Sequence, residues 1–155
     1  MSKVMSVSYE LLWWAFTLVL AGLVLLPVYT TLPEFPYFTA NFVYVVVAIT
    51  LTRYLFFLNI SWLRDRFVLQ AALCLALFPL VFWMGQYFNY FITFFDEQGP
   101  DVLTRNLDRD TAGVIDDYLH AEYRLFGTWA IVAAAVTPPR MLYNVWVRYK
   151  QKNRK

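Results

Sequence analysis

The sequence predicts an all-α, polytopic integral membrane protein: a bundle of four transmembrane helices with an acidic, partly helical outer loop. Hydrophobic residues make up 60% of the 155 residues, and charged residues only 15%. A soluble domain is closer to half apolar and a quarter charged, so this composition is not that of a typical soluble protein. The chain also contains four long apolar segments, which a soluble protein of this length could not bury. We expect a single transmembrane domain.

Each apolar segment is long enough to cross a hydrocarbon core of ~30 Å, which takes about 20 residues at ~1.5 Å per residue. The expected spans are residues 11–32, 42–63, 67–95 and 125–147. We interpret the first as a retained helix, because it is much longer than the ~7–15 apolar residues of a signal peptide. The third is longer than a membrane requires, so it either tilts and kinks at Pro79 or projects outward.

The loop at 96–124 is acidic and is expected to be partly helical. Asp110 and Thr111 form a candidate N-cap, and apolar side chains follow at intervals of three and four residues. This pattern predicts a helix that starts at about residue 110 and continues into span four.

Lysine and arginine residues gather on one side of the predicted bundle. Lys3, Arg64, Arg66 and the basic tail at 148–155 lie on the side of the termini, whereas most acidic residues lie in the loop at 96–124. Because cations near span ends stay in the cytoplasm, both termini are expected inside, in an inner (plasma) membrane. The tail is expected to anchor the chain at the bilayer surface, or to bind anionic lipid or protein.

A charged side chain inside a membrane is costly and marks a candidate functional site. Arg53 falls at the middle of span two, and none of the four spans contains a carboxylate. Glu10 and Asp65, at the inner boundary, are the nearest acidic candidates. Without an acidic residue in the spans, a proton relay of the kind used by pumps has no candidate either.

Pro138 and Pro139 in span four could provide hydrogen-bond acceptors for the guanidinium of Arg53. Each proline lacks an amide hydrogen, so carbonyls near Ala134 and Ala135 lose their helical donor and the helix is expected to kink. One hypothesis is that Arg53 hydrogen-bonds these carbonyls and locks the bundle. The alternatives are that Arg53 lines a wet cavity, a pore, or a site for an anion or lipid headgroup, or that it faces a partner protein.

Two further groups of polar residues are candidates for a ligand site or a pore lining. Arg140 and Asn144 share one inner face of span four with Arg148. That face fits either an electropositive vestibule or an interfacial edge with snorkelling cations. Gln86 and Asn89 lie one turn apart on the outer half of span three, where amides hydrogen-bond across helices or contact a ligand.

His120 is the only histidine, and it follows Asp116 by one helical turn. The two residues could form a weak metal or pH-sensitive site, or simply a solvated helix face. One histidine beside carboxylates is a weak pattern, so we expect no bound metal and no cofactor. The single cysteine, Cys74, excludes an internal disulfide framework. A net charge of +2 gives no reason to expect a nucleic-acid partner.

The chain carries no catalytic motif, so the leading hypothesis is a non-catalytic structural or assembly subunit, either a homo-oligomer or bound to a partner membrane protein. Rows of small residues support this view, because they let helices approach closely. These rows are Ala15 and Gly22; Ala72 and Ala76; and Gly127, Ala130 and Ala134. A second hypothesis is a homo-oligomeric pore or small transporter that favours anions and is lined by Arg53 and Arg140. A third is a membrane enzyme acting on a lipid or quinone.

Overall fold

The computed structural model describes residues 3–99 and 101–152, and every regular element in these ranges is a helix. The elements are α1 (Lys3–Thr31), α2 (Phe38–Phe57), the 3-10 helix η1 (Trp62–Asp65), α3 (Phe67–Gln98), α4 (Asp101–Thr104) and α5 (Arg109–Lys152). The four long helices each contain a stretch that is long and apolar enough to cross a membrane. The expected all-α class is therefore confirmed, as is the expectation of four helices able to span a membrane.

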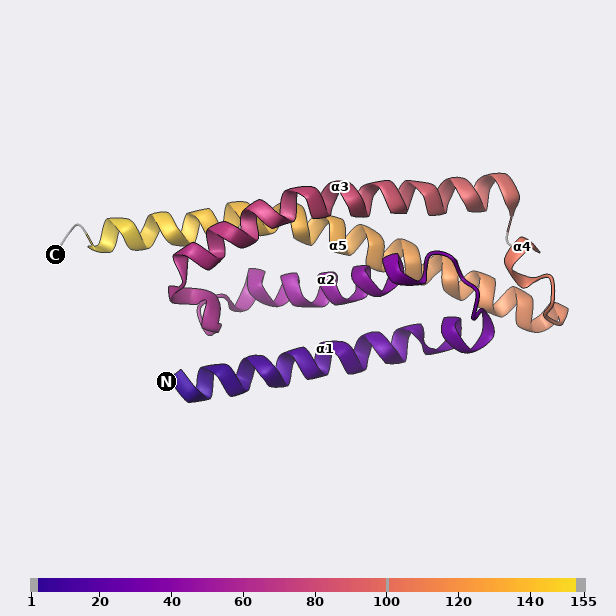
Figure 1. Ribbon diagram of the computed structural model, residues 1–155, viewed down its shortest axis with the longest axis horizontal. Coiled ribbons are helices and arrows are strands. Elements are labelled where there is room, and N and C mark those ends of the chain that lie inside the picture. Colours follow the sequence, from indigo (N-terminus) through magenta and orange to yellow (C-terminus); the bar gives the residue numbers. More distant parts are fainter. Residues whose placement is uncertain (1–2, 100, 153–155) are drawn as a thin grey trace.

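Helices α2 and α5 form the centre of the bundle. Helix α1 packs mainly against α2, and α3 packs mainly against α5, so α1 and α3 lie on opposite sides of the central pair (Figure 1). Successive long helices run antiparallel, and both ends of the chain therefore lie at the same end of the bundle (Figure 1). Because α1 and α3 each pack mainly against one long helix, most of their apolar side chains face outward.

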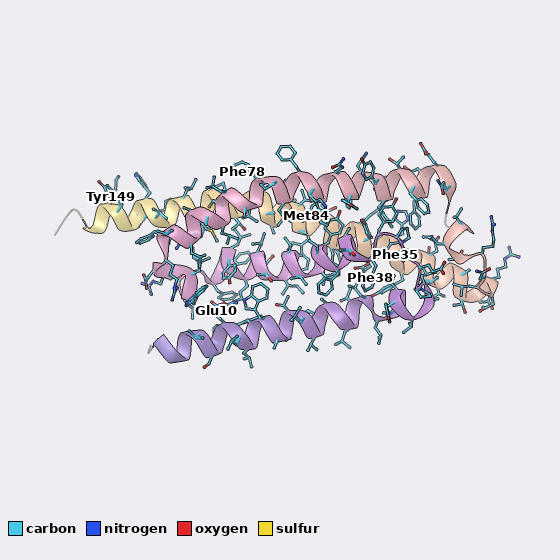
Figure 2. The ribbon with its side chains drawn as sticks, in the orientation of Figure 1. Glu10, Phe35, Phe38, Phe78, Met84 and Tyr149 are labelled. Carbon is cyan, nitrogen blue, oxygen red and sulfur yellow. The ribbon has the colours of Figure 1, made fainter. Side chains whose placement is uncertain are left out.

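Two helices are longer than a membrane requires. Helix α3 has 32 residues and α5 has 44, which correspond to roughly 48 Å and 66 Å at ~1.5 Å per residue. Helix α3 bends near Phe78, next to Pro79, where the missing amide hydrogen weakens the helix (Figure 2). It ends at Gln98, at the end of the bundle away from the two chain ends (Figure 1). Helix α5 continues through Pro138 and Pro139 without a break.

The helical start expected near residue 110 is confirmed, because α5 begins at Arg109. Its cap differs by two residues from the expected Asp110. The carboxylate of Asp108 accepts a hydrogen bond of 3.0 Å from the backbone amide of Thr111. This is the geometry of an N-cap aspartate bonded to the third helical residue.

Span two is shorter than expected, and this corrects the depth assigned to Arg53. Helix α2 ends at Phe57, and the chain then turns through η1 into α3 instead of continuing as helix to Leu63. Arg53 lies four residues before the end of α2, about 6 Å along the helix axis, and not at the middle of the span. The turn contains Ser61, whose hydroxyl accepts a hydrogen bond from the amide of Leu63.

Stacked aromatic rings fill the half of the core that lies away from the two chain ends (Figure 1). The ring of Tyr123 on α5 lies 3.6 Å from that of Phe91 on α3, and Tyr44 meets Tyr123 edge-on at 5.1 Å. The hydroxyl of Tyr44 donates to the carbonyl of Met84, whose side chain lies inside the bundle (Figure 2). Gly127 makes room for this cluster, because a Cβ atom there would lie 2.5 Å from the ring of Phe88.

Candidate functional site: a buried ion pair beside an apolar cavity

Arg53 forms an ion pair with Glu10, one of the two acidic residues at the inner boundary that the sequence offers as its nearest candidates. Its Nη2 atom lies 2.6 Å from Oε1 of Glu10, and the two side chains are only 6% and 8% exposed. Glu10 belongs to α1 and lies in the space between α1 and α2 (Figure 2). Helix α1 begins at Lys3, well before the expected span, and this extension places Glu10 beside the last turns of α2.

Glu10 also holds the turn that follows α2. The hydroxyl of Ser61 and the backbone amide of Trp62 donate to Oε1 at 2.8 and 3.0 Å. The hydroxyl of Tyr54 donates to Oε2 at 3.4 Å. One carboxylate thus joins α1, the end of α2 and the start of η1, and charge-assisted hydrogen bonds of this kind are among the stronger ones in proteins.

Aromatic rings surround the guanidinium of Arg53. Its Cζ atom lies 5.2 Å from the ring centroid of Tyr54, 5.6 Å from that of Trp13 and 5.9 Å from that of Tyr9. These distances are within the range of cation–π attraction. The Nε and Nη2 atoms have no aligned hydrogen-bond acceptor among the described residues, so the guanidinium is held by charge and by the rings.

The hypothesis that Arg53 hydrogen-bonds the broken backbone of span four is wrong. Its ionic partner lies on α1, and no hydrogen bond joins Arg53 to α5 within the described ranges. Near the two prolines, the hydroxyl of Thr137 donates to the carbonyl of Ala133, and the thiol of Cys74 lies 3.9 Å from the carbonyl of Pro138. The carbonyl groups of α5 near the prolines are therefore contacted by a side chain of the same helix and by a side chain of α3.

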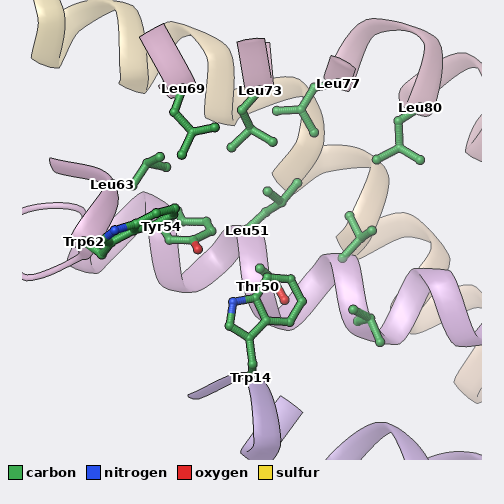
Figure 3. Close-up of a pocket in the computed structure, with 12 residues that line it drawn as sticks. Trp14, Thr50, Leu51, Tyr54, Trp62, Leu63, Leu69, Leu73, Leu77 and Leu80 are labelled. Carbon is green, nitrogen blue, oxygen red and sulfur yellow. The ribbon is translucent and has the colours of Figure 1, made fainter. Parts of the chain in front are cut away.

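An apolar cavity of about 290 Å³ lies next to the ion pair (Figure 3). Helix α2 forms its floor, Trp14 of α1 forms one side, and α3 forms the other side. Tyr54 and Trp62 belong to both features, because each lines the cavity and hydrogen-bonds Glu10. The complete lining is Trp14, Val46, Val47, Thr50, Leu51, Tyr54, Trp62, Leu63, Leu69, Leu73, Leu77 and Leu80.

The other candidate residues do not gather around this cavity. Asn144 is buried, and its amide donates to Oε1 of Gln70 at 3.3 Å, so it ties α5 to α3. Arg140 is half-buried one turn away on α5. Gln86 and Asn89 are exposed on α3, and Gln86 bonds the hydroxyl of Tyr90 on its own helix, which corrects the expectation of a bond across helices.

A second buried polar group, missed from the sequence, lies between α2 and α5. The amide of Asn41 donates to Oε2 of Glu122 at 2.7 Å, and both side chains are buried. Asn41 Oδ1 and Glu122 Oε1 have no hydrogen-bond partner in the described part of the chain. Glu122 lies in the acidic, partly helical region expected between spans three and four, and the length of α5 brings it against the start of α2.

His120, the weak metal candidate beside Asp116, packs against α3. The ring of His120 packs 5.5 Å from that of Phe95, and its Nε2 atom is buried. Within residues 3–99 and 101–152, no group of three or more His, Cys, Asp or Glu side chains is arranged to hold a metal ion.

Comparisons with protein-family models, with curated proteins and with solved structures gave no match to this chain. The class therefore rests on the chain itself: an all-helical protein with four helices able to span a membrane, tied together by buried polar contacts.

Proposed function

We propose that this protein is a non-catalytic structural or assembly subunit that associates with further copies of itself in an inner (plasma) membrane, with both termini in the cytoplasm. The observation that carries the proposal is the direction in which its rows of small residues face. Ala15 and Gly22 are exposed on α1, and a Cβ atom at Gly22 would meet nothing within 4 Å.

Ala72 and Ala76 on α3 are likewise exposed. The row on α5 contrasts with these two, because Ala130 and Ala134 are fully buried and Gly127 contacts Phe88. Small residues in membrane helices allow close backbone approach, and such rows recur at helix–helix interfaces. The row on α5 is used inside the bundle, whereas those on α1 and α3 are open to a partner helix.

The internal polar contacts support the same role. Glu10 with Arg53, and Gln70 with Asn144, connect helices to each other. The pairing turns the charge of Arg53 toward α1, which favours an assembly role over the anion-favouring pore that Arg53 and Arg140 would line.

The mass of the purified full-length protein in mild detergent tests the proposal. We expect particles of more than one chain, and we expect Gly22→Leu to reduce their mass to that of one chain, because the larger side chain blocks close approach. Gly113→Leu is the matched control, since Gly113 also has open space around its Cβ position but lies near the start of α5. A wild-type protein that is strictly monomeric and binds no other protein contradicts the proposal.

A further inference from the structure

The apolar cavity lies between the two outer helices, α1 and α3 (Figure 3). Helices α1 and α3 lie on opposite sides of the central pair, and the cavity lies between Trp14 of α1 and the leucines of α3 (Figure 3). At bilayer depth the medium outside is hydrocarbon. Water has few hydrogen-bond partners in such a space, whereas a hydrocarbon chain fits its lining.

The size of the cavity limits what it can hold. A volume of about 290 Å³ is at the lower end of the ~300–1,000 Å³ typical of small-molecule pockets. It suits a single hydrocarbon chain and is too small for a whole lipid. The headgroup of such a lipid must therefore lie outside, at the end of the cavity closed by η1.

Two arginines, Arg64 and Arg66, lie at the η1 end of the cavity. The guanidinium of Arg66 lies 4.3 Å from the ring centroid of Trp62, and Trp62 lines the cavity. Arg64, two residues earlier, is exposed and bonds the carbonyl of Asn59 through Nη1. Arginine binds phosphate through a planar pair of N–H donors, and an arginine stacked on a ring keeps those in-plane donors available.

We propose that this cavity binds one acyl chain of an anionic phospholipid, with the phosphate held by Arg64 and Arg66. The lipid would pack against Trp62 and cover the buried ion pair of Glu10 and Arg53 from the membrane side. The site is independent of self-association, because neither row of outward-facing small residues lines the cavity.

Native mass spectrometry of the full-length protein released from nanodiscs tests this site. Nanodiscs containing equal amounts of phosphatidylglycerol and phosphatidylcholine are the probe. Wild type should retain one phosphatidylglycerol per chain in preference to phosphatidylcholine. The double variant Arg64→Gln, Arg66→Gln should lose that preference by roughly fivefold for each arginine, the effect of one cation near an anionic surface.

The control for charge is Arg105→Gln, Arg109→Gln, which removes two cations from the other end of the bundle and should leave the preference unchanged. Leu73→Trp fills the cavity and should abolish retention of both lipids, whereas Leu75→Trp, on the outer face of the same helix, should behave as wild type. If Leu73→Trp does not fold, Leu80→Phe replaces it. Equal retention of both lipids by wild type, or normal retention by the filled variant, would overturn the proposal. Displacement of the lipid by inorganic phosphate alone would also overturn it, because the acyl chain would then contribute nothing.

Discussion

Arg53 on α2 and Glu10 on α1 form a buried ion pair, with 2.6 Å between Nη2 and Oε1. The pair lies one turn before α2 ends, and the same carboxylate holds the turn that leads to α3. A charge that the sequence leaves unexplained is thus part of the contact between three consecutive elements. Cations also interact favourably with the C-terminal end of a helix, where Arg53 lies.

Removing one member of this pair should destabilise the bundle more than removing both. Arg53→Leu leaves the buried carboxylate of Glu10 without its cation, and breaking a buried ion pair in this way costs about 3–5 kcal/mol. The double variant Glu10→Leu, Arg53→Leu leaves no unpaired charge and should recover much of that loss. Thermal unfolding in detergent provides the measurement. Arg53→Leu with the stability of wild type would exclude the pair as a structural contact.

Gly127 and Gly22 should respond in opposite directions to the same small change. Gly127→Ala places a methyl group against Phe88 and should destabilise the protein by about 1–3 kcal/mol through overpacking. Gly22→Ala adds the same methyl group in open space and should be neutral or stabilising by up to ~1 kcal/mol, because alanine is the better helix former. Unfolding of the two variants side by side checks the contrast, which fails if both variants behave alike.

Glu122 should tolerate replacement by glutamine but not by alanine. In the structure Asn41 Oδ1 and Glu122 Oε1 are both buried acceptors without a donor. The amide of a glutamine can donate to Asn41 Oδ1 while its oxygen still accepts from Asn41 Nδ2. Alanine would instead leave the whole amide of Asn41 unsatisfied, at a cost of about 1–3 kcal/mol. Urea or SDS titration of Glu122→Gln and Glu122→Ala should rank them in this order, and the reverse order would refute the geometry.

The start of α5 should loosen in acid. The hydrogen bond from the backbone amide of Thr111 lowers the pKa of Asp108, so the folded helix favours the ionised carboxylate. The resulting stabilisation is present above the ordinary aspartate pKa of ~3.9 and is lost as the pH falls through the lowered value. Amide hydrogen exchange at Thr111 should report this loss. After correction for the intrinsic pH dependence of exchange, Asp108→Ala should show little protection of this amide at any pH. A wild-type protection factor that does not fall in acid would contradict the cap.

The long apolar runs were sufficient to predict four spans, since length and hydropathy depend on local sequence alone. The end of α2 was not predictable in this way. Residues 58–63 are apolar enough to extend a helix, and the turn there is fixed by Glu10, more than forty residues earlier in the chain. The sequence could not decide between Glu10 and Asp65 as the partner of Arg53 for a similar reason, because the extent of α1 before the apolar run decides where Glu10 lies.

Contacts between helices also determine whether the other candidate residues are buried or exposed. Asn144 and Gln86 have similar amide groups at membrane depth, yet Asn144 is buried against Gln70 and Gln86 is exposed. The rotation of each helix about its own axis, relative to its neighbours, decides which of the two amides is buried. The sequence pattern of a single helix does not predict this rotation. The rows of small residues show the same limit, since only packing reveals that the row on α5 faces inward.

Cysteine cross-linking in the native membrane tests the central claim, that α1 presents a contact surface to a second copy. In a Cys74→Ala background, Gly22→Cys places one thiol on the outward-facing row of α1. Mild oxidation should then convert the 18.3 kDa chain into a species of about twice that mass. Gly113→Cys in the same background should stay monomeric. The account is contradicted if Gly22→Cys yields no cross-linked dimer while remaining reactive toward a small thiol reagent.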